Sequence, residues 1–137
     1  YSYTDSDGLH GSRRLAEEWS RSGLLKRCRA MILLDMIGDR DLCLSVPANS
    51  SPELVRLLES LAGKMTPPLK YVLREGDIID DHVPFLKAGV PALDLIDFEY
   101  GPGNRFWHTS GDTLDKISGQ SMKTVADLTL RMIWNLP

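Results

Sequence analysis

Acidic and imidazole side chains bracket one stretch of the chain, residues 80–109, and these residue types can carry proton-transfer or metal chemistry. The stretch begins with Asp80-Asp81-His82 and ends with Trp107-His108-Thr109. Between them, a short amphipathic segment is followed by an apolar run of strand length, PALDLI. The reactive groups therefore lie at the ends of regular elements, where the side chains of an α/β fold converge on a cleft.

Asp35 is a further candidate, because it interrupts the apolar run MILLDMIGD near its C-terminal end. A buried carboxylate is costly unless it is paired, hydrogen-bonded or bound to a metal. Asp35 either takes part in chemistry or caps a turn at the strand end. Its position in the sequence does not favour one role over the other. One of Asp80 and Asp81 is expected to cap the short helix that follows. Held close to Asp35, either one could share a proton with it as a coupled pair, and the carboxylates of Asp35 and Asp80 are expected to lie within hydrogen-bond reach.

Other polar residues leave alternatives open. His108 ends a loop rich in Gly, Pro and Asn, where it is either a metal ligand through a neutral ring nitrogen or an ordinary loop residue. Asp94 alternates into LDLID and faces either the same cleft or solvent, with solvent favoured. His10 precedes a helix and is expected to be a cap or a surface residue. Cys28 and Cys43 are expected to be buried thiols rather than a disulfide.

The elements that must position these residues alternate between helices and strands. Turn and capping signals predict helices over 13–22, 51–63, 83–88 and 118–134, and apolar runs predict strands over 29–37, 42–46, 69–73 and 91–96. The first strand is apolar on both faces, which is typical of burial between helices. The first two strands are expected to neighbour each other, with a turn near residues 38–41. This order predicts an α/β fold with a mixed central sheet sandwiched by helices.

Composition narrows the class of protein. The 137 residues correspond to about one domain, and 42% hydrophobic with 26% charged residues is ordinary for a globular protein. The net charge of -3, without a basic block, argues against nucleic acid as a partner. No apolar run approaches the roughly 18 residues that a membrane span needs. Because the chain begins at Tyr1 without Met, its sequence does not decide the compartment.

Three motifs, in this order and spacing, resemble the C-terminal half of the M28-type zinc exopeptidases: DMIGD, DDHVPFLKAGVPALDLID and WHTSGDT. The resemblance covers nearly the whole chain from about Gly8 onward. Within that superfamily the chain looks most like the glutaminyl-peptide cyclotransferases, or glutaminyl cyclases. Aminopeptidases of the family usually have Ser-Asp-His in place of Asp80-Asp81-His82, and often Tyr in place of Trp107. Both features of this chain are therefore cyclase-like.

The resemblance implies a role for each of four residues. His108 matches the family's zinc-binding histidine, and Trp107 matches the aromatic residue that packs against the N-terminal glutamine side chain of the substrate. Asp80 matches a cyclase carboxylate in a proton-handling network. Asp35 matches a position that belongs to this network in one-zinc cyclases and binds a second metal in two-zinc aminopeptidases. Asp94 stands where vertebrate cyclases have a histidine, so the outer part of the network differs here.

The resemblance also implies an incomplete domain. The family's remaining metal ligands and its Glu-Glu pair precede the matching region, so residues 1–137 would be the C-terminal half of one catalytic domain. The intact domain would bind one zinc ion and convert the N-terminal glutamine of a peptide to pyroglutamate with release of ammonia, whereas this chain alone would be inactive. A zinc aminopeptidase, or a non-catalytic half-domain with a decayed site, is the alternative. By the same resemblance, the parent protein is expected to be secreted or periplasmic.

Overall fold

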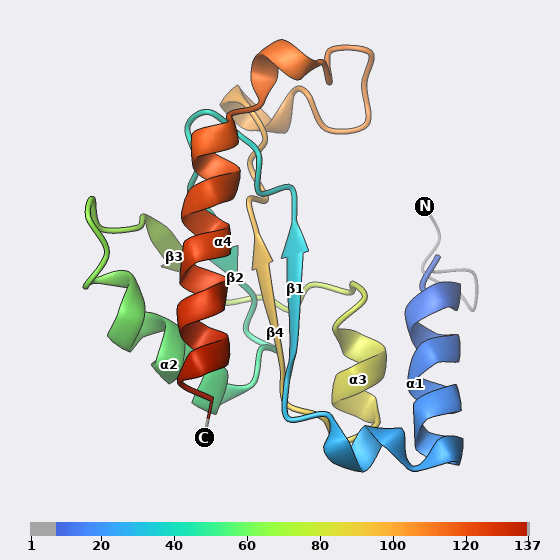
Figure 1. Cartoon of the computed structure of the whole chain (residues 1–137). Coiled ribbons are helices and arrows are strands. Elements are labelled where there is room, and N and C mark those ends of the chain that lie inside the picture. The colour runs from blue at the N-terminus through green and yellow to red at the C-terminus, as the bar shows by residue number, and fades with distance from the viewer. Residues whose placement is uncertain (1–7, 137) are drawn as a thin grey trace.

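The computed structural model describes residues 8–136, which form an α/β fold (Figure 1). Its helices are α1 (His10–Ser22), α2 (Pro52–Ala62), α3 (Val83–Lys87) and α4 (Gly119–Trp134). Its strands are β1 (Met31–Asp35), β2 (Leu44–Val46), β3 (Tyr71–Leu73) and β4 (Ala92–Ile96). The predicted fold class and order of these elements are confirmed. Among the described helices, none combines the length and the apolar composition that crossing a membrane requires.

The four strands form one mixed sheet in the order β1-β4-β2-β3. β4 runs parallel to β1, with Asp35 opposite Ile96, and antiparallel to β2, with Ser45 opposite Ile96. The predicted pairing of the first two strands is wrong, because β4 inserts between them. All five residues of β4 are buried, so this strand takes a central place with partners on both edges. Cys28 and Cys43 are half-buried free thiols.

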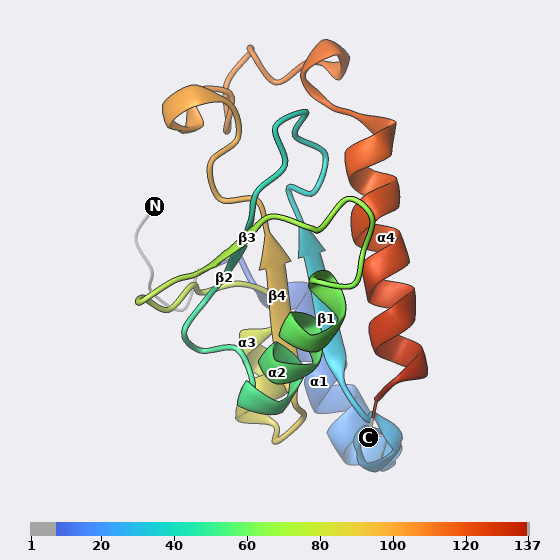
Figure 2. The same cartoon turned by 90° about the vertical axis from the view of Figure 1, so that its left-hand side faces the viewer.

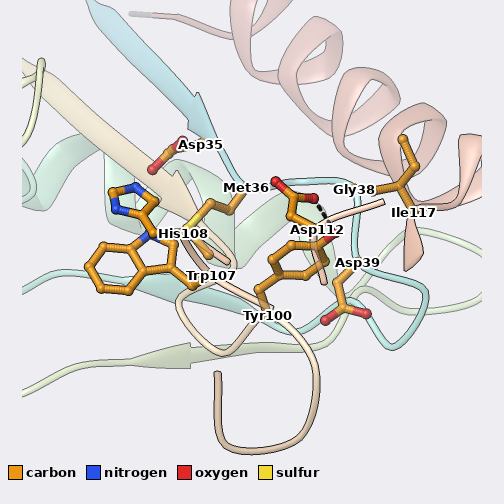
Figure 3. Close-up of a pocket in the computed structure, with 9 residues that line it drawn as sticks. All are labelled: Asp35, Met36, Gly38, Asp39, Tyr100, Trp107, His108, Asp112 and Ile117. Atoms are coloured by element: carbon orange, nitrogen blue, oxygen red, sulfur yellow. Dashed lines mark hydrogen bonds between the residues drawn. The ribbon is translucent and has the colours of Figure 1, made fainter. Parts of the chain in front are cut away.

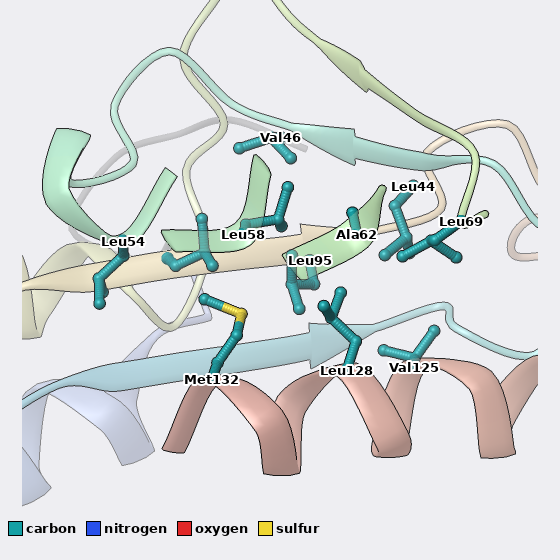
Figure 4. Close-up of a cluster of buried hydrophobic side chains, with 11 residues drawn as sticks. Leu44, Val46, Leu54, Leu58, Ala62, Leu69, Leu95, Val125, Leu128 and Met132 are labelled. Carbon is teal, nitrogen blue, oxygen red and sulfur yellow. The ribbon is translucent and has the colours of Figure 1, made fainter. Parts of the chain in front are cut away.

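The sheet lies between two pairs of helices (Figures 1 and 2). α2 and α4 cover one face, where their aliphatic side chains form the larger core with β2 and β4 (Figure 4). α1 and α3 cover the other face, where Ala92 of β4 packs with Phe85 of α3. Successive side chains of a strand point to opposite faces. Asp94 therefore lies on the same face as Ala92, and the parallel register puts Asp35 of β1 on that face as well.

The helix boundaries follow the local signals. α1 ends at Gly23, whose φ of 76° is left-handed, and α4 begins after Ser118, whose hydroxyl accepts a hydrogen bond from the backbone N–H of Ser121 at 3.4 Å. α2 begins at Pro52 after Ser51, as predicted, but the Ser51 hydroxyl does not cap it. That oxygen accepts a hydrogen bond from the backbone N–H of Ala92 at 2.9 Å, so it joins the start of α2 to β4.

β1 is less buried than its apolar sequence predicts. The strand is only half-buried, and Leu34 is 38% exposed. Among the described strands only β4 pairs with β1, so the other edge of β1 has no strand partner within residues 8–136. Stable proteins usually pair or cover an apolar edge of this kind. The sequence of β1 therefore suits a strand with neighbours on both sides.

Candidate functional site

A cleft lies at the C-terminal end of β1 (Figure 3). Its volume is about 270 Å³. Two segments far apart in sequence line it, the turn that follows β1 and the long loop between β4 and α4. The lining residues are Asp35, Met36, Gly38, Asp39, Tyr100, Trp107, His108, Asp112 and Ile117. Three of the four residues singled out from the sequence thus meet in one cavity: Asp35, Trp107 and His108.

Asp35 is a half-buried carboxyl in the lining of this cleft. Burial raises the pKa of its carboxyl, and the negative charges of Asp80 and Asp81 raise it further. The backbone N–H of Met36 and the nearby ring of His108 act in the opposite direction. A carboxyl with a raised pKa exchanges its proton closer to neutral pH than an ordinary aspartate does. Asp35 therefore suits a proton-transfer role.

Asp80 lies beside the cleft rather than in its lining. One carboxylate oxygen accepts a hydrogen bond from the backbone N–H of Asp81 at 2.6 Å. Its negative charge raises the pKa of Asp35, so the two carboxyls interact electrostatically. The expected direct hydrogen bond between Asp35 and Asp80 does not occur among the hydrogen bonds of residues 8–136. The capping prediction is also wrong, because His82 precedes the first residue of α3 and no side chain caps that helix.

Trp107 and His108 form a stacked pair on one wall of the cleft (Figure 3). Their ring centroids are 4.2 Å apart and their planes differ by 23°. Trp107 remains 43% exposed, so its indole can receive a ligand. His108 has a φ of 53°, and Met36 on the opposite segment has a φ of 52°. Left-handed backbone at non-glycine residues costs about 1–2 kcal/mol each, and such strain gathers at functional sites.

The loop that carries this pair is tied to the rest of the molecule by polar contacts. The buried Asp39 accepts hydrogen bonds from the backbone N–H groups of Gly101 at 2.6 Å and Asp41 at 3.0 Å. The hydroxyl of Tyr100 donates to Asp112 at 2.7 Å, and this bond raises the pKa of Tyr100 to about 12. The sequence predicts a turn at Asp39 and assigns no functional role to Asp39 or Asp112. Their positions just after a strand and just after the Trp-His pair were the available signals.

Gly101 is the position in this loop that a side chain would disturb most. A Cβ there would meet the ring of Phe106 at 2.2 Å, and Gly101 has a φ of 68°. We expect Gly101→Ala to lower the free energy of unfolding by about 2–4 kcal/mol, from backbone strain and overpacking together. The matched control is Gly103→Ala, since Gly103 has a φ of 64° but no atoms within 4 Å of a built Cβ.

Urea unfolding of both variants measures this difference. The Gly103 variant should lose only the backbone contribution of about 1–2 kcal/mol. Equal losses in the two variants would contradict a packing role for the contact between Gly101 and Phe106.

The described residues do not form a complete metal site. A catalytic zinc ion takes three protein ligands from His, Cys, Asp or Glu and keeps one position open. Within residues 8–136, no group of three such side chains is arranged to hold a metal ion. The cleft supplies His108, with Asp35 nearby. Any zinc ion bound here would therefore need ligands from elsewhere.

Comparison with known families decides what kind of protein this is. A family model described as peptidase family M28 matches residues 5–133. The chain belongs to peptidase family M28. Its similarity to the M28 exopeptidases, expected from three motifs, is confirmed.

M28 relatives include both cyclases and peptidases. A glutaminyl-peptide cyclotransferase of Drosophila melanogaster is 32% identical over 131 residues, covering 81% of this chain and 36% of that protein. The crystal structure of an Acidobacteriales bacterium glutaminyl cyclase matches with a TM-score of 0.89 and 43% identity, covering 99% of this chain and 47% of that one. A zinc aminopeptidase from Bacillus subtilis matches with a TM-score of 0.72 and 26% identity, covering 92% and 32%. This M28 chain spans less than half of the length of each.

A buried polar pair of this M28 chain, His82 and Asp94, lies outside the lining of the cleft. Asp94 and His82 are both 0% exposed, and His82 Nδ1 lies 3.9 Å from Asp94 Oδ2. The expectation that Asp94 faces the cleft or solvent is wrong, because the alternation of β4 turns its side chain toward α3 and into the interior. Sequence reasoning noted His82 beside the acidic pair and gave it no role. His10, by contrast, is exposed at the start of α1, as expected.

Proposed function

We propose that the intact protein is a glutaminyl-peptide cyclotransferase, which converts the N-terminal glutamine of a peptide to pyroglutamate. One observation carries the proposal. Identity to the Acidobacteriales glutaminyl cyclase is 43% over 99% of this chain, whereas identity to the zinc aminopeptidase from Bacillus subtilis is 26% over 92%. Residues 1–137 would be the C-terminal half of one catalytic domain, and the preceding half would complete the cleft.

The reaction that we propose takes place within one residue of the substrate. A bond forms between the α-amino nitrogen and the γ-carbonyl carbon, the bond from that carbon to the amide nitrogen breaks, and ammonia leaves. One proton must pass from the attacking amine to the leaving nitrogen. Since the nucleophile and the electrophile belong to the same side chain and backbone, orientation is the main task of the cleft. The exposed indole of Trp107 offers a flat apolar wall for that purpose.

Asp35 and Asp80 are the proposed proton carriers. Burial and the negative charge of Asp80 raise the pKa of Asp35. The Asp35 carboxylate is therefore a stronger base than that of an ordinary aspartate, which suits it to accept a proton from the attacking amine. Asp35 would take the proton from the attacking nitrogen and return it to the leaving nitrogen. Asp80, whose charge acts on Asp35, would tune this basicity.

His108 is the proposed metal ligand of this chain. We expect one zinc ion in the intact domain, held by His108 together with ligands from the preceding half, because the described residues alone do not complete a site. Bound zinc would supply a Lewis acid for the γ-amide carbonyl. The proposed roles of Asp35, Asp80 and Trp107 do not depend on which residues complete the metal site.

A zinc aminopeptidase is the second candidate, favoured by the similarity to the enzyme from Bacillus subtilis. In that case Asp35 would bind a second metal ion, and water would attack a peptide bond. The lower identity to that enzyme and the exposed Trp107 wall weigh against this candidate. A non-catalytic half-domain is the third reading, and the presence of Asp35, Trp107 and His108 in one cleft weighs against it.

The decisive experiment supplies the intact protein with a peptide that begins with glutamine. We expect ammonia release and a lactam at the peptide N-terminus. The matched control is the same peptide acetylated on its α-amine, which lacks the nucleophile and should not react. Release of a free N-terminal amino acid, without lactam formation, would contradict the cyclotransferase and support the aminopeptidase.

A further inference from the structure

The buried pair of His82 and Asp94 holds polar atoms that the proposed reaction does not use. Both side chains are 0% exposed. Within residues 8–136, the two ring nitrogens of His82 and the two carboxyl oxygens of Asp94 make no hydrogen bond. Buried polar atoms nearly always have hydrogen-bond partners, because leaving them without one is costly. His82 Nδ1 and Asp94 Oδ2 lie 3.9 Å apart.

The fold brings these residues together from two sides. Asp94 lies in the middle of β4, and its backbone N–H donates to the hydroxyl of Ser50 at 3.5 Å. His82 directly precedes α3, and its backbone carbonyl accepts the hydrogen bond of Leu86 N–H at 3.1 Å. The same turn begins at Asp80, whose backbone carbonyl accepts from Val83 N–H at 2.9 Å. The position of the His82 ring is thus linked to the turn that carries Asp80.

Burial, ahead of the nearby charges, decides where the proton of this pair resides. Asp80 and Asp35 face Asp94, while Asp80, Asp77 and Asp81 act on His82. Burial, followed by the charges of Asp80 and Asp35, raises the pKa of Asp94 to about 7. Burial lowers the pKa of His82, although the three acids near it oppose this change. Below about pH 7 the proton therefore belongs on Asp94, beside a neutral imidazole that can accept a hydrogen bond.

We propose that His82 and Asp94 hold one proton between them and form a positioning pair behind the Asp35–Asp80 site. The carboxyl O–H of Asp94 would donate to His82 Nδ1 after the two groups approach each other by about 1 Å. This bond fixes the start of α3 and with it the turn of Asp80. It also keeps a third negative charge away from Asp35 and Asp80. Neither residue touches the substrate, and the positioning role rests on the proposed function.

The titration of the pair tests its protonation without any activity measurement. In the intact protein with isotope-labelled histidine rings and aspartate carboxyls, NMR follows the chemical shifts of these groups from pH 4 to 9. We expect a neutral His82 ring at pH 7 and an Asp94 carboxyl that ionises near pH 7. Asp94→Asn should remove that carboxyl signal, whereas the control Asp97→Asn, at another buried carboxyl just after β4, should retain it. A cationic His82 ring at pH 7, or an Asp94 carboxyl ionised at pH 5, overturns the proposal.

Kinetics of the intact protein test the positioning role. Asn at position 94 can still donate a hydrogen bond to His82, whereas Leu cannot. We expect Asp94→Leu to lower kcat about 10-fold with little change in KM, and Asp94→Asn to keep kcat within about 3-fold. The kcat profile of Asp94→Asn should also lack an ionisation near pH 7 that the wild type shows. Identical kcat values and pH profiles in the wild type and both variants overturn the positioning role.

The two proposals fail in different ways. If the wild-type protein forms no lactam, the proposed function fails, while the NMR titration still decides whether His82 and Asp94 hold a proton. If lactam forms and the titration shows an ionised Asp94 at pH 5, the proposed function stands and the buried pair is overturned.

Discussion

Replacement of Asp35 by asparagine is expected to lower the turnover of the intact protein by about 100-fold or more, while its zinc content stays at about one ion per domain. The change keeps the size and much of the hydrogen bonding of the side chain, but it removes the charge that accepts a proton. Burial and the charge of Asp80 raise the pKa of this carboxyl, and asparagine cannot reproduce that property. The measurements are ammonia release from a glutaminyl peptide and metal content.

Trp107→Ala is the companion variant, because Trp107 lines the same cleft and carries no ionisable group. It should weaken substrate binding and misplace the substrate with metal retained. If Asp35 binds a second metal ion, Asp35→Asn should lose metal together with activity. Full activity in Asp35→Asn would exclude both roles for that residue.

Separation from the preceding half of the domain is expected to abolish both zinc retention and lactam formation. The described residues bring only His108 and Asp35 toward the proposed metal position, and residues 8–136 hold no group of three ligands. A single histidine cannot keep a catalytic zinc ion against exchange. The 137-residue chain should therefore retain no stoichiometric zinc after dialysis.

The control for this prediction is the intact protein with and without His108→Ala. The intact wild type should retain about one zinc ion per domain, and the variant should lose most of it. Tight, stoichiometric zinc binding by the 137-residue chain alone would contradict the prediction. Retention of zinc by the His108→Ala protein would remove His108 from the ligand set.

Local signals were sufficient for most elements of the fold. Pro52 begins α2 and Ser118 caps α4, because the restricted φ of proline and side-chain capping act over a few residues. β4 is buried throughout, as its sequence predicts, because all of its residues except Asp94 are apolar. These features depend on neighbours in sequence, so a pattern of residues reveals them.

Strand order and buried polar contacts could not be read in the same way. A short connection favoured a hairpin of the first two strands, but burial of β4 between β1 and β2 outweighs it. The side chain of Asp94 lies against His82, a residue on a different element, and alternation alone could not choose between cleft, solvent and interior. The bond from Gly101 N–H to Asp39 likewise joins segments that only the tertiary fold brings together.

The candidate site shows the same division. Asp35 at a strand end and His108 after a Gly-rich loop were predicted to meet, and they line one cleft. Asp80 interacts with Asp35 through charge and not through the expected direct hydrogen bond. Tyr100 and Asp112 support the loop through a hydrogen bond between residues whose types are common in any turn. Such contacts depend on the closed loop, so neither residue alone signals them.

The strand order β1-β4-β2-β3 also determines when the strands can pair during translation. β1 emerges first among the four strands, yet its described strand partner, β4, is not complete until Ile96, whereas β2 can already pair with β3 once Leu73 has emerged. Until β4 is complete, the apolar β1 has no described strand partner, and its direct pairing with β2 would be non-native. Pairings between distant segments form slowly, and such waiting intermediates are prone to aggregate. A chaperone that holds the nascent segment 31–46 would therefore protect this protein at its most vulnerable stage.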